Sequence, residues 1–416
     1  MSATNCYGEQ LGRGTHNLFI LGDAIANLPR LIESYAGLIQ TIYLDPPFQT
    51  GSRFTLRLQL SGHKQTPVAI PSYDDSLPAA DYYTMMNEVL KGCYELLNDN
   101  GSLFLHIDPR TCAHLRIMLD GIFGEDNFVN EIIWHYKSGG RAKNHFSKKH
   151  DNILFYRKTK KAYFDISSIG IPRGKDMQNH MRRVTDEEGR VVYTIKSGGK
   201  TYTYSEDTPI YPSDVWTDIS HLQQKDPERT GYDTQKPEAL LKRIILSTSR
   251  PGDLVMDLFS GSGTTASAAS KADRRFVAVD SSPIALSLLR RRLLSREQTL
   301  MDSELPGTLL LFDVAKPPKI GQLEYTCSRA NGRADVTLAS YTPSVGLDTP
   351  EVYTGLALVD YCALGFVDDG IFLPCSYNIR PLRGGTIPNL YLAPDKPNLA
   401  LLVSDVFGCQ GIISIE

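Results

Sequence analysis

Short, mostly apolar runs alternate with helix-like segments through most of the first 300 residues. Runs of four or five such residues are typical of strands that are buried on both faces of a sheet. They lie at 18–21, 41–44, 103–107, 153–156, 254–258 and 276–279. Several are followed by Gly, Asp or Pro and then by apolar positions at helical spacing, as in 82–97 and 237–249. The pattern therefore predicts a doubly wound, mostly parallel α/β sheet.

The pattern changes twice along the chain. Between about residues 134 and 233, glycine pairs, many Tyr and Lys residues and weak periodicity predict a loop-rich insertion. After about residue 302, the segment 316–319 predicts a linker, and the apolar runs beyond it predict a small β-rich unit. These runs lie at 353–359, 371–374 and 399–406, with a turn at 368–370. A further turn is expected at 98–101, before the strand at 103–107.

Composition excludes several classes of protein. With 41% hydrophobic and 22% charged residues, the chain has the ordinary make-up of a globular protein, and no apolar run approaches the roughly 18 residues of a membrane span. The amino terminus lacks the features of a signal peptide, and the seven cysteines are scattered. His145 and His150 have no further ligands beside them. A cytoplasmic protein without a membrane segment, a disulfide scaffold or a metal site is therefore expected.

Basic residues are concentrated in one part of the chain. The formal net charge is −3, yet residues 134–200 hold 16 Lys and Arg against 6 Asp and Glu. Such an island is the expected footprint of a segment that binds a polyanion, with a solvated surface lobe as the alternative. Residues 319–416 are acidic, with 6 Lys and Arg against 10 Asp and Glu. This tail is therefore expected to pack on the rest of the protein or to serve a partner.

The strand at 41–44 ends in Asp45-Pro46-Pro47-Phe48. Functional groups in open α/β sheets lie at the carboxyl ends of strands. Two prolines fix the turn and leave a carbonyl without a competing N–H, so a carboxylate and a carbonyl face one cleft beside an aromatic ring. Such a cleft suits a planar amine, whose two hydrogens bond the two acceptors while the ring stacks. Taken alone, the four residues are equally compatible with a simple turn from strand to loop.

A second motif follows the strand that begins at Leu254. The strand ends at Asp257, and Gly261-Ser262-Gly263 then leads into a helix rich in Ala and Ser. Asp280 ends the next strand, at the position from which an acid holds ribose hydroxyls in nucleoside-binding βαβ units. The third glycine of the dinucleotide fingerprint is missing, which argues against a pyrophosphate ligand. The motif predicts a nucleoside whose remaining part is not phosphate, although Gly-x-Gly alone also suits a tight turn.

Together, Asp45-Pro-Pro-Phe48 and the later segment 257–265 resemble the amino-group DNA methyltransferases of bacteria and phages. These enzymes use S-adenosylmethionine, and the order of catalytic motif before cofactor motif is that of their β class. Further similar segments lie at 21–23, 122–128, 131–134 and 234–241. The resemblance covers roughly residues 16–300. It implies a Rossmann-like S-adenosylmethionine-dependent methyltransferase with a circularly permuted motif order.

The resemblance implies a catalytic role for each residue of the first motif. The carboxylate of Asp45 and the carbonyl of Pro46 would accept hydrogen bonds from the exocyclic amine of the target base. Pro47 would stiffen the turn, and Phe48 would stack on a base that has left the duplex. The two acceptors would favour the form of the amine with a localised lone pair as it attacks the sulfonium methyl. Neither a metal nor a covalent intermediate is required.

The resemblance also implies a set of residues that bind S-adenosylmethionine. Asp23 would contact the adenine, Asp257 the methionine ammonium and Asp280 the ribose. The complete implied set is Asp23, Lys236, Asp257, Phe259, Gly261, Gly263, Thr264 and Asp280.

The basic insertion falls where this class of enzyme carries its target-recognition region. Its Lys and Arg side chains are expected to meet mainly phosphates of double-stranded DNA, and a minority to read bases. The candidates for DNA binding are Lys137, Arg141, Lys143, Lys148, Lys149, Arg157 and Lys158.

The expected units are a catalytic half at 1–133, the target-recognition insertion at 134–233, a cofactor-binding half at 234–302 and a C-terminal accessory unit at 319–416. A homodimer or a partner subunit held by the C-terminal unit is also considered. The acid at Asp45 favours adenine N6 as the acceptor, because cytosine-N4 enzymes more often have Ser there. Methylation of cytosine N4 or of RNA, and a non-catalytic DNA-binding subunit, remain the alternatives.

Overall fold

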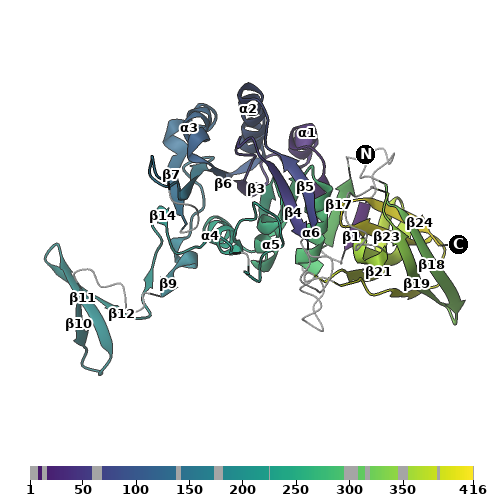
Figure 1. The fold of residues 1–416 in the computed structure, drawn as a ribbon. Coiled ribbons are helices and arrows are strands. Elements are labelled where there is room, and N and C mark those ends of the chain that lie inside the picture. Colours follow the sequence, from purple (N-terminus) through teal and green to yellow (C-terminus); the bar gives the residue numbers. More distant parts are fainter. Residues whose placement is uncertain are drawn as a thin grey trace.

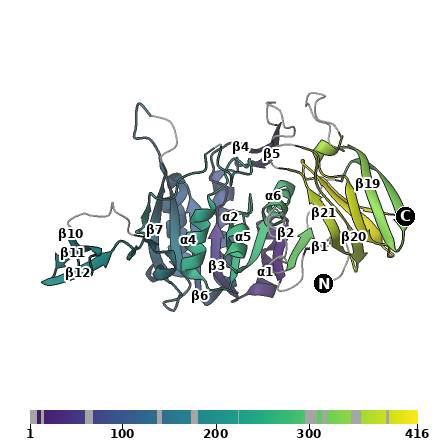
Figure 2. The ribbon, with the colours of Figure 1, turned by 90° about the horizontal axis from the view of Figure 1, so that it is seen from below.

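The computed structural model describes residues 8–11, 16–58, 68–136, 142–172, 181–223, 225–294, 308–313, 319–344, 355–381 and 385–415. A 14-stranded sheet runs through the molecule, with helices on both faces of its central part (Figure 1). A three-stranded arm projects at one end, and a β-rich unit lies at the other end (Figure 2). The linker predicted at 316–319 lies, except for its last residue, outside the described ranges.

Six neighbouring parallel strands form the centre of the sheet. In spatial order they are β6 (Leu97–Ile107), β3 (Ile39–Leu44), β15 (Leu254–Asp257), β16 (Arg275–Asp280), β2 (His16–Leu21) and β17 (Thr308–Asp313). The predicted α/β sheet is confirmed, and the six apolar runs lie in strands, except that Leu258 follows the end of β15. Since β3 and β15 pair directly, two motifs that are far apart in the sequence reach the same edge of the sheet.

In the described part of the chain, three helices cover each face of the central sheet. One face carries α1 (Ala24–Tyr35), α2 (Ala79–Leu96) and α3 (Pro109–Phe123), and the other carries α4 (Glu238–Thr248), α5 (Thr264–Lys271) and α6 (Pro283–Leu294). Fully buried side chains such as Leu90 on α2 and Ile245 on α4 anchor these helices, and the burial of each contributes about 1.5–3 kcal/mol to the free energy of folding. Within the described ranges, every helix is too short or too polar to cross a membrane.

The turn predicted at 98–101 is wrong, because these residues lie inside β6. Ile39 pairs with Leu97 and Thr41 with Ser102, so four residues of β6 bulge opposite Gln40 alone. The Gln40 side chain binds this bulge through the carbonyl of Asn100 (3.0 Å) and the side chain of Asn98 (3.1 Å). The polar residues that suggested a turn are therefore held by a neighbouring strand.

Antiparallel strands extend the sheet on the side of the insertion. They are β8 (His150–Arg157) and β7 (Phe128–His135), and the short β14 (Val215–Trp216) pairs in parallel with β7 at the edge. The arm consists of β10 (Arg182–Thr185), β11 (Val191–Ser197) and β12 (Lys200–Ser205), and β9 (Ile171–Pro172) pairs with β13 (Pro209–Ile210) at its base. A separate ribbon of β4 (Arg53–Leu58) and β5 (Val68–Asp74) follows the first motif.

The C-terminal unit is β-rich, as predicted, and it continues the central sheet. Strand β1 (Gly8–Leu11) joins β17 to β21 (Ile371–Ile379), which is followed in space by β20 (Val359–Asp368), β23 (Leu399–Asp405) and β24 (Gln410–Ser414). A second sheet, β18 (Gln322–Ala330), β19 (Arg333–Thr342) and β22 (Leu390–Pro394), packs on these strands through a shared apolar core. The turn predicted at 368–370 connects β20 and β21, with Asp369 and Gly370 at positive φ.

The C-terminal unit also packs on α6 of the central domain. Arg291 of α6 forms a buried ion pair with Asp360 of β20, and Arg380 Nη2 lies 3.4 Å from the same carboxylate. Gly408 approaches Pro283 so closely that a side chain there would lie 2.5 Å from the proline ring. The expectation that the acidic tail packs on the rest of the protein is therefore confirmed.

The buried pair between Arg291 and Asp360 yields a prediction about stability. Both side chains are almost fully buried, so Asp360→Ala leaves a guanidinium without its carboxylate. We expect the free energy of unfolding to fall by about 3–5 kcal/mol, measured by urea denaturation. Asp368→Ala, at the exposed end of the same strand, is the control and should change it by less than about 0.5 kcal/mol. Equal effects of the two substitutions would contradict the prediction.

Candidate active site

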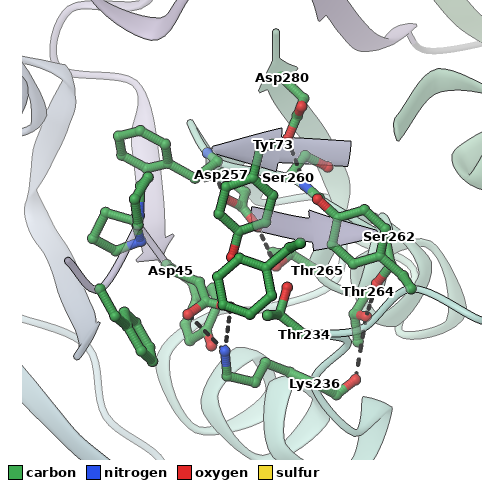
Figure 3. A pocket seen from close by; sticks show the side chains of 18 of the residues that line it. Asp45, Tyr73, Thr234, Lys236, Asp257, Ser260, Ser262, Thr264, Thr265 and Asp280 are labelled. Carbon is green, nitrogen blue, oxygen red and sulfur yellow. Dashed lines mark hydrogen bonds and ion pairs between the residues drawn. The ribbon is translucent and has the colours of Figure 1, made fainter. Parts of the chain in front are cut away.

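Neighbouring strands deliver acidic residues to one edge of the sheet. Asp45 directly follows β3, Asp257 ends β15 and Asp280 ends β16. Because the carboxyl ends of parallel strands meet at one edge, these three residues line a common cleft that opens to solvent (Figure 3). Asp23 follows β2 at the same edge, but it is not among the residues that line the cleft. Its exposed side chain caps α1 by accepting from the N–H of Ala26 (2.9 Å).

The first motif and one lysine meet in this cleft. Lys236 Nζ donates to Asp45 Oδ1 (2.7 Å) and Oδ2 (2.5 Å), as Figure 3 shows. The ring of Phe48 lies 5.0 Å from the same nitrogen, and Pro46 and Pro47 line the cleft beside it. The structure therefore brings the four predicted catalytic residues together. It places the ammonium of Lys236, which was expected to bind the cofactor, on the carboxylate of Asp45.

A buried carboxylate outside both motifs shapes the loop that carries Phe48. Asp75 accepts hydrogen bonds from the backbone N–H groups of Phe48 (3.2 Å), Gln49 (2.9 Å) and Thr50 (2.9 Å). Gln49 has a φ of 55°, a left-handed conformation that is unfavourable for a residue with a side chain. The three hydrogen bonds to Asp75 offset the free-energy cost of this backbone conformation. Sequence reasoning missed Asp75, because nothing in a single sequence links residue 75 to the loop at 48–50.

A buried polar network lies behind the ring of Phe48. His106 is fully buried, and its ring centroid is 6.0 Å from that of Phe48. Its Nδ1 pairs with the hydroxyl of Tyr43 (2.8 Å), and its Nε2 pairs with Asp151 Oδ2 (3.1 Å). Tyr136 donates to the other oxygen of Asp151 (3.1 Å). The network joins the ends of four strands, β3, β6, β8 and β7, so the surface that supports Phe48 is held by hydrogen bonds as well as by packing.

The second motif forms a tight turn between β15 and α5. Gly261 and Gly263 have φ values of 48° and 74°, which favour glycine. A side chain at Gly263 would lie 3.0 Å from Leu289, and one at Gly261 would lie 3.4 Å from the ring of Tyr232. Asp280 accepts from the N–H of Gly261 (2.7 Å), which closes the turn against β16. The two glycines therefore let the backbone come close to any ligand in the cleft.

Asp257 lies at the bottom of the cleft and is almost fully buried. It accepts from the hydroxyl of Thr265 (2.5 Å) and from the N–H of Phe259 (2.9 Å), whose side chain also lines the cleft. Burial raises its pKa from 3.8 to about 7, although these two hydrogen bonds oppose the shift. The carboxyl group is therefore partly protonated near neutral pH, and a cationic ligand would favour its charged form.

Three aromatic residues form a wall of the cleft that sequence reasoning did not anticipate. Phe54 on β4 stacks on Tyr73 of β5 with ring centroids 4.9 Å apart, and Tyr73 stacks on Tyr232 at 6.4 Å. All three line the cleft. Opposite them, the hydroxyl of Thr264 donates to the carbonyl of Lys236 (3.3 Å), so the two predicted cofactor segments are in contact.

The predicted DNA-binding residues fall into two groups. Lys143, Lys148 and Lys149 lie in the segment 142–149, which leads into β8. Because β8 is antiparallel to β6, its first residues lie beside the end of β6, at the edge of the sheet that carries the cleft. The same segment exposes the side chain of Phe146 almost completely. Lys137 and Arg141 lie outside the described residues.

Arg157 and Lys158 lie at the opposite edge of the sheet. Arg157 pairs with Ser102 near the start of β6, and its Nη2 donates to the carbonyl of Asp126 (3.2 Å). Lys158 donates to the carbonyl of Leu97 (2.5 Å), and burial lowers its pKa. The structure therefore does not bring these two residues together with the active-site cleft.

The fold and the lining of the cleft have the features expected of a nucleoside-binding α/β enzyme, and comparison with known proteins identifies its family. A family model described as DNA methylase, N6_N4_Mtase, matches residues 39–290. The chain belongs to this family. It is therefore an S-adenosylmethionine-dependent DNA methyltransferase of the adenine-N6 and cytosine-N4 group. The resemblance inferred from the two motifs is confirmed.

Relatives of similar sequence are methyltransferases. The chain is 29% identical to the type II methyltransferase M.EcaI of Enterobacter cloacae, over 66% of this chain and 69% of the relative. It is 26% identical to the DNA adenine methyltransferase YhdJ of Escherichia coli, over 70% and 86%. Among solved structures, it is similar to the cytosine-N4-specific PvuII DNA methyltransferase, with 15% identity, a TM-score of 0.44 and coverage of 69% and 89%.

The cleft fits S-adenosylmethionine by charge and by shape. Its described lining contains four carboxyl groups, Asp45, Asp75, Asp257 and Asp280, but a single basic side chain, Lys236. This excess of acid suits a ligand that carries a sulfonium and an ammonium. The glycine turn provides the close backbone approach, and the aromatic wall suits a flat base. Among the described residues, no group of three or more His, Cys, Asp or Glu could hold a metal ion.

The raised pKa of Asp257 predicts how cofactor binding depends on pH. If Asp257 meets the ammonium of the ligand, binding requires the charged carboxylate, so the protein must release a proton below about pH 7. Affinity for S-adenosylmethionine should then rise with pH up to about 7 and level off above it. Calorimetry in buffers of different ionisation enthalpy measures both the affinity and the released proton. Asp257→Asn should bind more weakly without this pH dependence; an unchanged profile would assign the titration to another group.

Proposed function

We propose that this protein methylates adenine N6 at a specific site in double-stranded DNA. The observation that carries the proposal is the position of Asp45 and Phe48 in the same cleft as the glycine turn and Asp280. An acid at the head of the first motif favours adenine, and the relative YhdJ is named a DNA adenine methyltransferase. Because M.EcaI is named a type II methyltransferase, we place the chain among the modification enzymes of restriction systems, acting in the cytoplasm.

The residues of the cleft activate a poor nucleophile. The lone pair of an aromatic amine is delocalised into its ring, and two acceptors that bind both N–H groups favour the localised form. Asp45 and the carbonyl of Pro46 are these acceptors, and Asp45 is also placed to hold the proton that the amine loses. Bound S-adenosylmethionine supplies the activated methyl group. The ring of Phe48, held by Asp75 and backed by His106, stacks on the flipped base.

The basic segment 142–149 supplies contacts with the DNA backbone. It lies at the edge of the sheet that carries the cleft, and Lys143 and Lys148 are exposed there. Phosphate contacts from such side chains position a duplex without reading its sequence. Arg157 and Lys158 are no longer assigned to the DNA surface, because they lie at the other edge. A homodimer or partner subunit held by the C-terminal unit stays a prediction.

The mechanism predicts that Asp45→Ala removes methyl transfer but not cofactor binding. We expect the rate to fall by at least about 100-fold, because one of two acceptors for the amine is lost. Affinity for S-adenosylmethionine should change by less than about threefold, since the assigned cofactor contacts are intact. The assay incubates protein, unmethylated DNA and S-adenosylmethionine, and mass spectrometry of the digested nucleosides identifies the product. An active variant would refute the role of Asp45.

The same assay on the wild-type protein decides the acceptor base. N6-methyladenine is the expected product. N4-methylcytosine would overturn the assignment to adenine but keep the mechanism, because both bases present an amine to the same acceptors. Absence of any methylated base, although the cofactor binds, would overturn the proposed activity on DNA.

The position of the basic segment predicts the salt dependence of DNA binding. Replacing Lys143 and Lys148 with Ala should weaken binding and reduce the slope of log affinity against log salt by about 1–2, since each phosphate contact contributes about 0.9. Fluorescence anisotropy with a labelled duplex measures the slope. The matched control replaces Lys160 and Lys161, which are exposed beyond the far end of β8, and removes the same charge. If both pairs reduced the slope equally, the duplex would not be located at the cleft edge.

A further inference from the structure

Resting on the proposed function, we propose that Lys236 is an internal counter-ion that occupies both oxygens of Asp45 until the target amine displaces it. The sequence resemblance assigned Lys236 to the cofactor. The contacts in the cleft assign it instead to the group that receives the base.

The contact is direct and shielded from water. Lys236 Nζ lies 2.7 Å and 2.5 Å from the two oxygens of Asp45, and the two side chains are only 10% and 18% exposed. The ammonium also lies 5.0 Å from the centre of the Phe48 ring, on which the base would stack. A positively charged nitrogen donor therefore stands where the exocyclic amine must donate, beside the same ring. The lysine and the base compete for the same acceptor.

The backbone of Lys236 is fixed, whereas its side chain can move. The hydroxyl of Thr264 donates to the Lys236 carbonyl, and the next residue, Pro237, precedes α4. The preceding Gln235 is held by Thr230 and by the carbonyl of Glu228. A lysine has four rotatable side-chain bonds and a point charge that binds without a fixed geometry. The ammonium can therefore leave Asp45 without any movement of the cofactor turn.

Charge determines when the lysine leaves. Within the described lining of the cleft, Lys236 is the single basic side chain among four carboxyl groups. To transfer its methyl group to an amine bound at Asp45, S-adenosylmethionine must place its sulfonium close to this ammonium. The two positive charges then repel each other strongly, because the dielectric constant of the cleft is low. S-adenosylhomocysteine, the product, has a neutral sulfur in the same position. The substrate cofactor therefore favours displacement of Lys236, and the product cofactor favours its return to Asp45.

The return of the lysine would also help to release the methylated base. After methyl transfer, the amine has passed one proton to Asp45 and keeps a single N–H. Once Asp45 has released that proton to solvent, the remaining N–H competes for the carboxylate with an ammonium that no longer faces a sulfonium. Lys236 thus links the charge state of the cofactor to the occupancy of the base site. No covalent step is involved, because the lysine only exchanges one set of hydrogen bonds for another.

The test compares the affinities for S-adenosylmethionine and S-adenosylhomocysteine by calorimetry. In Lys236→Met, the ratio of the two affinities should shift towards S-adenosylmethionine by at least about threefold, because the repelling charge is gone and Asp45 is free. Lys236→Arg retains the charge and should keep the ratio within about twofold of the wild-type value. Lys236→Gln repeats the neutral substitution with a polar side chain, and thermal melting checks that each variant is folded.

A double variant separates the two roles of the lysine. In an Asp45→Asn background, no carboxylate holds the ammonium beside the sulfonium. Adding Lys236→Met should therefore shift the ratio of the two affinities less than it does in the wild type. If Lys236 instead binds the cofactor itself, Lys236→Met should weaken both ligands equally and leave the ratio unchanged, which would overturn the inference. Failure of the wild-type protein to bind S-adenosylmethionine would overturn the proposed function instead, so the two failures are distinguishable.

Discussion

The convergence of four carboxyl groups at one edge of the sheet is the constraint on which the active site depends. Buried carboxylates repel one another and lose hydration, so each needs its own compensation. Asp75 is bound by three backbone N–H groups, and Asp280 by those of Gly261 and Ser282. Asp257 is compensated by hydrogen bonds and by a raised pKa. Asp45 alone is compensated by the ammonium of a lysine side chain, the contact on which the proposed exchange with the target amine depends.

Helix α6 connects this edge of the sheet with the C-terminal unit at the far end of the molecule. Leu289 of α6 packs against the glycine turn at Gly263, and Arg292 donates to the hydroxyl of Thr264 (3.2 Å). The neighbouring Arg291 is paired with Asp360 of the C-terminal unit. One helix thus touches both the cofactor turn and the β-rich unit. The C-terminal unit is therefore part of the framework that holds the turn, although none of its described residues lines the cleft.

The sequence was sufficient to predict the centre of the fold and both motifs, because buried parallel strands leave an apolar signature and their polar ends carry the chemistry. It was insufficient wherever a contact joins segments without a local pattern. Asp75 binds a loop 25 residues earlier, as its hydrogen bond to Thr50 shows. Gln40 binds residues 98–101, whose sequence is typical of a turn, and holds them as a bulge in a strand. Lys236 was recognised as part of a motif, but its partner Asp45 became evident only from the geometry.

The direction of strand β8 determines which lysines of the basic island at 134–200 lie at the edge of the sheet that carries the cleft. Since β8 runs antiparallel to β6, the lysines that precede it lie at the edge of the sheet that carries the cleft, and Arg157 at its end lies at the opposite edge. A parallel strand would have reversed this arrangement without changing any residue. The net charge of the segment is the same in either case, so charge counting could not separate the two groups. The proposed DNA-binding surface is therefore determined by the topology of the sheet, and it includes only a part of the basic island.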